Sequence, residues 1–231
     1  MNRFLKRAWA EIDLDALEHN YNEIKKLAKG KDILAVVKAN AYGHDDKAVC
    51  IKLQELGVKY YGVSNLWEGE KLRCHGITGT ILTFGYTDED YFDELLEYGI
   101  TQTAGSVQYA KQLSDYAVSK GVKLPVHIKV NTGMTRVGID SQQEMLDILA
   151  MPGLDCKAAY THFAAADSLD PSDVEYTDRQ QEKLMKIAKD KGLLIHSQNS
   201  GGIIYHGDFG GDIVRAGVIP VSYTHLTLPT T

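Results

Sequence analysis

One lysine follows directly after a short apolar run. Residues 33–37 are Ile-Leu-Ala-Val-Val, and Lys38 comes next, shortly before Tyr42 and Gly43. A run this short, bounded by charge and glycine, is typical of a strand buried on both faces of a parallel sheet. Because such folds place their chemistry at the carboxyl ends of the strands, a lysine there would be partly desolvated and more nucleophilic. From this segment alone, a lysine that extends into solvent is equally compatible.

Later apolar runs also end in side chains that could bind or react. These are Lys129 and Arg136, Tyr160 and His162, Asn199 and Ser200, and Arg215 with Gly217. The last two turns contain glycine, so their backbone N–H groups could approach a phosphate closely, and barrels often bind phosphate there. A lysine, a phosphate cradle and an arginine together indicate pyridoxal phosphate (PLP), which the lysine would bind as a Schiff base.

Each of these residues also has a simpler interpretation. His162 could be a hydrogen-bonded core histidine, Arg136 could pair with a surface carboxylate, and Asn199 with Ser200 could cap a helix. Lys129 differs, because it lies within a strong strand pattern, where an unpaired ammonium is costly to bury. It needs a partner or a modification. We favour a shared function, because all of these side chains would lie at the same end of one sheet.

Alternating strand and helix patterns must position these residues. The predicted strands cover 33–38, 60–63, 80–84, 100–103, 125–130, 154–160, 193–197 and 212–215. The predicted helices between them cover 45–56, 66–74, 88–97, 106–120, 141–149 and 171–191. This alternation predicts an α/β fold with a parallel sheet, and about eight strands close a (β/α)8 TIM-type barrel. Too few residues follow Arg215 for a full eighth helix, so we expect that helix to be incomplete or missing.

The ends of the chain are interpreted separately from the barrel, which we assign to residues 15–220. Residues 9–14 alternate apolar and polar side chains, which predicts a half-exposed strand, with Asp15 capping the helix that follows. Residues 221–231 carry no charged side chain and show no helical period. They resemble translated adapter sequence, so we interpret them as a non-native tail; the alternative is a native disordered tail.

Composition limits the classes of function. A chain of 231 residues can bury one large core, and its formal charge of −6 gives no reason to expect a nucleic-acid or membrane partner. Neither the three cysteines nor any His/Asp/Glu group shows metal-ligand spacing, so we expect no metal. No apolar segment has the length of a membrane span or the form of a signal peptide. We therefore expect a cytoplasmic protein.

The segment AVVKANAYGH at residues 35–44 resembles the cofactor-lysine signature of the alanine racemase family. Supporting matches lie at residues 9–14, 127–138, 161–164, 199–200 and 214–217. The resemblance implies a PLP-dependent isomerase that interconverts L-alanine and D-alanine, a precursor of peptidoglycan. It covers only the PLP-binding barrel, and it leaves a serine-preferring racemase of the same family as an alternative. One departure is Asp45, which follows His44 where the family usually has glycine.

The same resemblance implies roles for individual residues. Lys38 would bind PLP and act as one of two proton-transferring bases, and Arg215 would face the pyridine nitrogen. His162 would lie against the ring and orient Arg215, while Arg136 would reach the phenolic oxygen and the substrate carboxylate. Lys129 matches a position that is often carbamylated. The implied cofactor-binding residues are Lys38, Tyr42, His162, Asn199, Ser200, Arg215, Gly217 and Val218.

The resemblance also implies parts that this chain lacks. The family's second base is a tyrosine from a carboxyl-terminal β-domain, supplied across a homodimer, and residues 1–14 would pair with that absent domain. We therefore expect the chain alone to have little or no racemase activity. Two alternatives remain: a single-domain barrel that binds PLP for cofactor homeostasis, and, with less support, a metal-dependent barrel enzyme.

Overall fold

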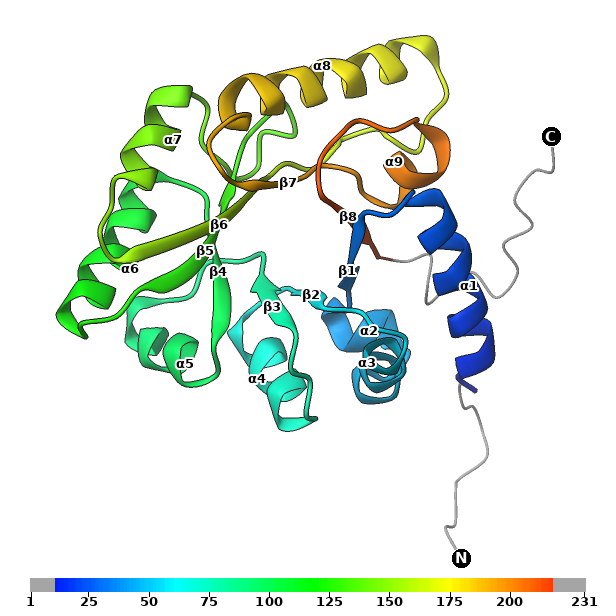
Figure 1. Ribbon diagram of the computed structural model, residues 1–231, viewed down its shortest axis with the longest axis horizontal. Helices are drawn as coiled ribbons and strands as arrows, with labels where there is room; N and C mark the ends of the chain where they lie inside the picture. Colours follow the sequence, from blue (N-terminus) through cyan, green and yellow to red (C-terminus); the bar gives the residue numbers. More distant parts are fainter. Residues whose placement is uncertain (1–10, 218–231) are drawn as a thin grey trace, which may run out of the picture.

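Eight parallel strands form a nearly closed barrel in the computed structural model, which describes residues 11–217 (Figure 1). The order of the strands in the sheet is β7-β6-β5-β4-β3-β2-β1-β8. The strands are β1 (Asp32–Val36), β2 (Tyr60–Val63), β3 (Thr80–Thr83), β4 (Ile100–Ala104), β5 (Leu124–Lys129), β6 (Leu154–Tyr160), β7 (Leu194–His196) and β8 (Ile213–Ala216). The predicted TIM-type α/β barrel is therefore confirmed.

Helices surround the barrel on its outer face (Figure 1). They are α1 (Leu14–Leu27), α3 (Asp46–Glu55), α4 (Leu66–Cys74), the 3-10 helix η1 (Glu89–Tyr91), α5 (Phe92–Glu97), α6 (Val107–Ser119), α7 (Gln142–Leu149), α8 (Pro171–Ala188) and α9 (Ser200–Tyr205). The segment labelled α2 (Lys38–Gly43) is a turn whose residues 39–42 have left-handed angles, and it follows β1 directly. Local capping explains several starts: Ser106 accepts the N–H of Tyr109, and Ser141 forms a capping box with Glu144. Helix α9 is not among the predicted helices, although the sequence left open that Asn199 with Ser200 caps a helix.

The joint between β7 and β8 closes the barrel with bonds outside a regular ladder. The N–H of Asp212 donates to the backbone oxygen of Ile195 at 2.8 Å, and the Asp212 carboxylate accepts the Ile195 N–H at 2.7 Å. Further along, the N–H of Arg215 donates to the backbone oxygen of Gln198 at 2.9 Å. These bonds place the loop after β7 directly beside β8, where the site lies.

Helix α1 covers the joint between the first and last strands. It packs against α3 and α9, and its apolar stripe of Leu17, Tyr21 and Ile24 is buried. It begins earlier than predicted: Asp13 accepts the N–H groups of residues 15 and 16, so Asp13 is the cap and Asp15 lies in the first turn. The strand predicted over 9–14 is wrong in its described part, because residues 11–13 form no strand and Leu14 begins α1; residues 9 and 10, and the residues after 217 where an eighth helix was expected to be incomplete or missing, lie outside the described residues.

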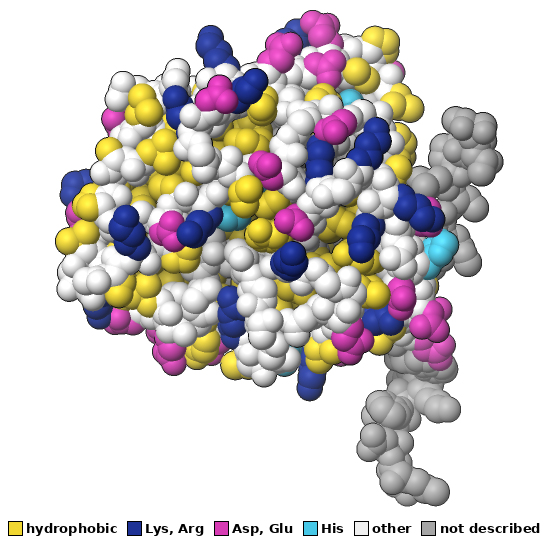
Figure 2. Space-filling model, viewed as in Figure 1, with side chains coloured by type: hydrophobic (Ala, Val, Ile, Leu, Met, Phe, Trp, Pro, Cys, Tyr) yellow, Lys and Arg dark blue, Asp and Glu magenta, His cyan; other side chains and the backbone are white. Residues whose placement is uncertain are grey.

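Apolar packing forms two layers. The larger core lies between the sheet and the helices, and a small cluster inside the barrel consists of Leu34, Val36, Leu82 and Ile213. Among the described residues, no helix is both long and apolar enough to cross a bilayer. On the face shown in Figure 2, basic and acidic side chains are interspersed and no single sign of charge dominates. Several buried polar side chains lie at the carboxyl ends of the strands, among them Lys129, His196 and Arg215.

Candidate active site

Lys38 lies just beyond β1, at the start of a left-handed turn. The sequence prediction placed it at the end of the strand, but β1 ends at Val36. The next four residues, Ala39 to Tyr42, have φ between 51° and 56°. Each left-handed residue other than glycine costs about 1–2 kcal/mol, so neighbouring groups must hold this turn in place. The Lys38 side chain is half-buried and makes no hydrogen bond or ion pair within residues 11–217.

The turn directs Tyr42 toward Ser200 and Gly217. The N–H of Gly217 donates to Oγ of Ser200 at 3.1 Å. A Cβ added at Gly217 would lie 2.9 Å from the Tyr42 hydroxyl and 3.8 Å from Oγ of Ser200. Burial raises the pKa of Tyr42, so its hydroxyl keeps its proton at neutral pH and can donate it to an anion. Two hydroxyls and a glycine N–H thus lie close together, and such groups could bind a phosphate; Val218 lies outside the described residues.

Asn199 has a structural role at the start of α9. Its Oδ1 accepts the N–H of Gly202 at 3.0 Å, and its Nδ2 donates to the backbone oxygen of Phe163 at 3.4 Å. Asn199 is therefore the N-cap of α9, which is the simpler of the two interpretations that the sequence left open. Within the described residues, Asn199 therefore positions Ser200 at the cradle, and the structure shows no direct contact of Asn199 with Tyr42 or Gly217.

The Arg215 guanidinium is enclosed by backbone oxygens. Its side chain is 3% exposed, and it donates to the backbone oxygens of Thr161 at 2.6 Å, His196 at 2.7 Å and Ser197 at 2.9 Å. Burial lowers the pKa of Arg215 to about 10, so the group stays charged at neutral pH. The tyrosine ring of Tyr160, 5.5 Å from its carbon centre, covers another side. This arrangement fixes a permanent positive charge inside the barrel mouth.

Three histidines form a chain of contacts that begins at Arg215, and all three must be neutral. Nδ1 of His162 lies 3.4 Å and Nδ1 of His196 lies 3.2 Å from guanidinium nitrogens. Because arginine only donates, both Nδ1 atoms accept, which puts each histidine's proton on Nε2. His196 Nε2 then donates to Nδ1 of His127 at 3.1 Å. Burial lowers the pKa of His162 to about 3 and that of His127 to about 4, and it lowers the pKa of His196 well below its usual value.

Strand register explains why these groups meet. Lys129 pairs with Tyr160 across β5 and β6, and Tyr160 pairs with His196 across β6 and β7. The rings of Tyr160 and His196 stack with centroids 4.7 Å apart, and the Tyr160 hydroxyl lies 2.8 Å from the Thr103 hydroxyl. No role was predicted from the sequence for His127, His196 or Thr103. The pairing register of the strands would have shown that these residues are neighbours, but that register cannot be predicted from one sequence.

Lys129 is buried without an acidic partner among the described residues. Its amine lies 3.1 Å from the backbone oxygen of Val130 and 5.3 Å from the Tyr160 ring. Burial, with the positive charges of Arg215 and Arg136, lowers the pKa of Lys129 to about 7. The expected need for a partner or a modification therefore stands. Arg136 lies in the exposed loop after β5 and makes no hydrogen bond or ion pair with any described residue.

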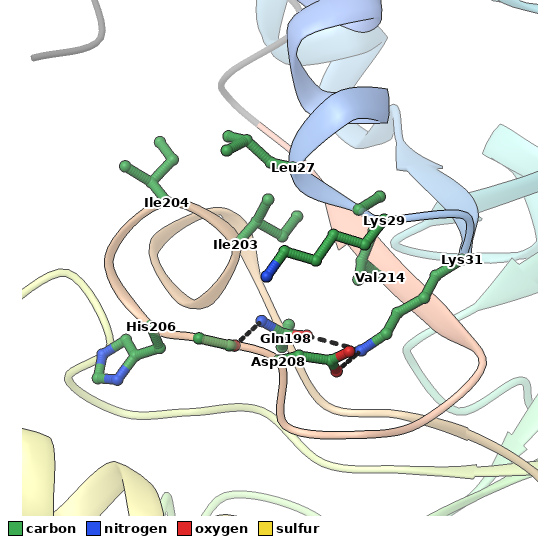
Figure 3. Close-up of a pocket in the computed structure, with 11 residues that line it drawn as sticks. Leu27, Lys29, Lys31, Gln198, Ile203, Ile204, His206, Asp208 and Val214 are labelled. Carbon is green, nitrogen blue, oxygen red and sulfur yellow. Dashed lines mark hydrogen bonds and ion pairs between the residues drawn. The ribbon is translucent and has the colours of Figure 1, made fainter. Parts of the chain in front are cut away.

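A separate cavity of about 130 Å³ lies between the end of α1 and α9, away from this cluster (Figure 3). Lys31 points toward Asp208 and Gln198 there, pairs with the Asp208 carboxylate and lies 3.4 Å from the Gln198 oxygen. Nε2 of Gln198 donates to the backbone oxygens of Gly202 and Gly207. These contacts connect the segment after α1 with the residues around α9. They therefore help to hold α9, which begins at Ser200, in place.

Comparison with known proteins decides the family. Residues 12–224 match the family described as "Alanine racemase, N-terminal domain". The chain belongs to the alanine racemase family. Members of this family depend on PLP, and the matched domain is the part that binds it. The resemblance inferred from residues 35–44 is thereby confirmed.

Alanine racemases match along nearly the whole chain. The alanine racemase of Clostridium perfringens (strain SM101 / Type A) is 38% identical over 96% of this chain and 60% of its own length. The structure of alanine racemase from Clostridium difficile 630 has a TM-score of 0.87 and 36% identity, covering 94% of this chain and 59% of its own. A histidine racemase from Leuconostoc mesenteroides subsp. sake has a TM-score of 0.82 and 27% identity over 90% of this chain and 57% of its own. The chain thus spans about 60% of the length of the curated alanine racemases it matches.

Proposed function

We propose that this chain is the PLP-binding barrel of an alanine racemase, an isomerase that interconverts L- and D-alanine. The observation that supports it most is the enclosed, charged Arg215 at the same barrel end as Lys38 and the Tyr42–Ser200–Gly217 cradle. A phosphate-binding site, an aldehyde-reactive amine and a group facing the pyridine nitrogen are three features with which a protein can hold PLP. All three are available from the described residues.

Some residues of the site would hold the cofactor, and Lys38 would also move a proton. Tyr42, Ser200 and the Gly217 N–H would hold the phosphate, and Lys38 would bond to the aldehyde. Bound PLP supplies an electron sink that makes the Cα–H of an amino acid acidic. Lys38 would then act as the base on one face, removing or returning the proton at Cα. Racemisation requires a second base on the opposite face, which the family supplies from beyond this domain.

Arg215 would set the strength of that electron sink. A guanidinium that is charged over the whole physiological range disfavours protonation of the pyridine nitrogen facing it. A weaker sink favours return of the proton over side reactions such as transamination. The neutral ring of His162 would lie against the cofactor and help to keep Arg215 oriented, as its 3.4 Å contact suggests.

Lys129 and Arg136 would act together on the substrate side. Carbamylation would convert the amine of Lys129, whose pKa is about 7, into an anion. That anion would hold the Arg136 guanidinium, which would reach the phenolic oxygen of PLP and the substrate carboxylate. The proposal explains how a lysine without an acidic partner in the described residues is accommodated beside two arginines.

Alanine is the substrate that the relatives' names support, with serine as the alternative within the family. The histidine racemase among the structural matches indicates that this fold also serves a larger side chain. We also propose a homodimer, a role in supplying D-alanine for peptidoglycan, and a cytoplasmic location, which three free cysteines support. The single-domain homeostasis barrel is less well supported, because matched alanine racemases extend well beyond this domain.

Two measurements test the proposal. The purified chain is incubated with PLP and reduced with borohydride, and peptide mass spectrometry should find the cofactor on Lys38 and none in the Lys38→Ala variant. The chain is also joined to the carboxyl-terminal portion of a matched alanine racemase, and exchange of the Cα proton in D2O is followed for L-alanine, L-serine and L-histidine. We expect the fusion to racemise alanine fastest and the chain alone to be inactive. No labelling of Lys38, or faster turnover of serine or histidine, would refute the corresponding part.

A further inference from the structure

Helix α4 binds the left-handed turn through one carboxylate. Oε1 of Glu68 accepts the N–H of Ala39 at 2.8 Å, and Oε2 accepts the N–H of Ser64 at 2.7 Å. Ala39 is the first left-handed residue after Lys38, and Ser64 directly follows β2. One half-buried side chain therefore ties the start of the turn to the end of the neighbouring strand.

A second group from α4 holds the next residue of the turn. Oδ1 of Asn40 accepts the N–H of Asp46 at 3.1 Å and lies 3.3 Å from the amine of Lys71, which also pairs with the Asp46 carboxylate at 2.9 Å. Within the turn itself, the N–H of Ala41 donates to the backbone oxygen of Val37 at 2.9 Å. The turn is therefore held on its outer side mainly by Glu68 and Lys71.

These contacts affect the positions of both the Lys38 amine and the Tyr42 hydroxyl, since the turn connects the two residues. If its backbone relaxed toward right-handed angles, the amine and the phosphate-binding hydroxyl would change their separation. Residues other than glycine remain left-handed only where surrounding contacts over-determine them. The bond to Ala39 is well placed to do this, because it fixes the peptide between Lys38 and the first left-handed residue.

We propose that Glu68 is a positioning residue, which keeps the 39–42 turn left-handed and thereby sets the geometry between Lys38 and Tyr42. The simpler alternative is that Glu68 only stabilises the first turn of α4, where an acidic side chain is favourable in any helix. The consequence for PLP rests on the proposed function, whereas the consequence for the turn does not. The two can therefore be tested separately.

The first experiment is a double-mutant cycle on stability. Glu68→Gln is made in the natural sequence and with Ala39→Gly, which allows left-handed angles without strain at an exposed position. Urea midpoints are measured for all four proteins. We expect Glu68→Gln to lower the midpoint clearly in the natural sequence and much less with Ala39→Gly. An equal loss in both backgrounds would show that Glu68 does not act through the left-handed turn, and would overturn the proposal.

Glu70→Gln is the matched control. Glu70 lies on the same helix and accepts a hydrogen bond from the Tyr98 hydroxyl at 3.2 Å, away from the turn. Its effect on the midpoint should be the same with and without Ala39→Gly. Hydrogen exchange supplies a local readout: Glu68→Gln should accelerate exchange of the Ala39 and Ser64 amides, and Glu70→Gln should not. Unchanged protection of Ala39 in Glu68→Gln would also overturn the proposal.

The second experiment links the turn to the cofactor. The rate of borohydride-trapped PLP attachment to Lys38 should fall on the order of tenfold in Glu68→Gln, about the factor that one charge-assisted hydrogen bond contributes. Glu70→Gln should keep the parent rate. If the parent chain itself does not bond PLP, the proposed function fails while the stability cycle still decides the role of Glu68. If the parent bonds PLP and Glu68→Gln does so equally fast, the positioning role fails.

Discussion

Arg215 and His196 meet inside the barrel, where one guanidinium nitrogen lies 2.7 Å from the His196 backbone oxygen and 3.2 Å from its Nδ1. A single residue thus presents two acceptors to the same donor group. The backbone oxygen fixes where the guanidinium lies, and the ring nitrogen fixes which histidine tautomer is present. Replacement of the Arg215 guanidinium should therefore affect the stability of the core as well as the site.

Arg215→Lys should destabilise the folded chain by about 2–4 kcal/mol, because an ammonium cannot reach three backbone oxygens arranged for a planar fork. The free energy of unfolding in urea measures this. Arg179→Lys is the control: Arg179 pairs with Glu175 at 2.8 Å on the exposed face of α8, and its replacement should change stability by less than about 0.5 kcal/mol. Equal effects of the two variants would contradict the enclosed-arginine interpretation.

Acid should destabilise the barrel through His127 and His196. The pKa of His127 falls to about 4 and that of His196 lies well below the usual 6.5, so between about pH 6 and 4 only the unfolded chain binds these protons. Stability should fall as pH falls through this window, by up to about 1.4 kcal/mol per pH unit for each histidine. Urea unfolding at several pH values measures the slope. His127→Leu should make the slope shallower, and an unchanged slope would count against this origin.

Lys129→Met should stabilise the chain at pH 7 in bicarbonate-free buffer, by about 1–3 kcal/mol, because it removes a buried ammonium without an acidic partner. The pKa of Lys129 is about 7 when folded and near 10.5 when unfolded, so the parent chain gains stability as pH rises between these values. The advantage of Lys129→Met should therefore shrink toward pH 10. Lys123→Met, at an exposed position, should have little effect at either pH.

Bicarbonate provides a further check on Lys129. If the amine is carbamylated, bicarbonate should raise the urea midpoint of the parent chain and leave Lys129→Met unchanged. An equal response of both proteins would indicate a general salt effect and would argue against the modification.

Gly217→Ala should destabilise the chain by about 1–3 kcal/mol, because the added Cβ would lie 2.9 Å from the Tyr42 hydroxyl. Tyr42→Phe removes that oxygen and leaves the ring carbon 3.6 Å away, so it should restore stability when combined with Gly217→Ala. The affinity for inorganic phosphate, measured by calorimetry, should stay low in the double variant. Recovery of phosphate affinity without the Tyr42 hydroxyl would contradict the cradle.

Much of the barrel is readable from the sequence, because each element has a local cause. The β6 strand and helix α4 have the predicted bounds, and α6 lies within the helix predicted over 106–120, with Ser106 as its cap. The turn after Lys38 was not predicted, since three of its four left-handed residues are alanine or tyrosine, which carry no local signal for that geometry. Helix α9 was left open as a possibility at Asn199 and Ser200 and was not predicted outright, because its first turn contains Gly201 and Gly202, which favour a loop.

The site was predictable only where the residue type itself suggests chemistry. Lys38, Tyr42, Ser200 and Arg215 could be selected by type and position at strand ends. His127 and Glu68 could not, because their importance comes from contacts across the fold. Histidine at 127 faces His196 only through strand register, and Glu68 reaches the turn only because α4 packs beside it. Such supporting groups become visible only in the three-dimensional structure.

The pairing of β1 with β8 has a consequence during synthesis. Asp32 and Ile213 are register partners, although about 180 residues separate them along the chain. At about 5–20 residues per second, the ribosome needs roughly 10–35 s to deliver the last strand after the first has emerged. For most of that interval α1 lacks α9, one of the two helices it packs against. A nascent chain of this protein should therefore be a substrate for chaperones until its eighth strand leaves the exit tunnel.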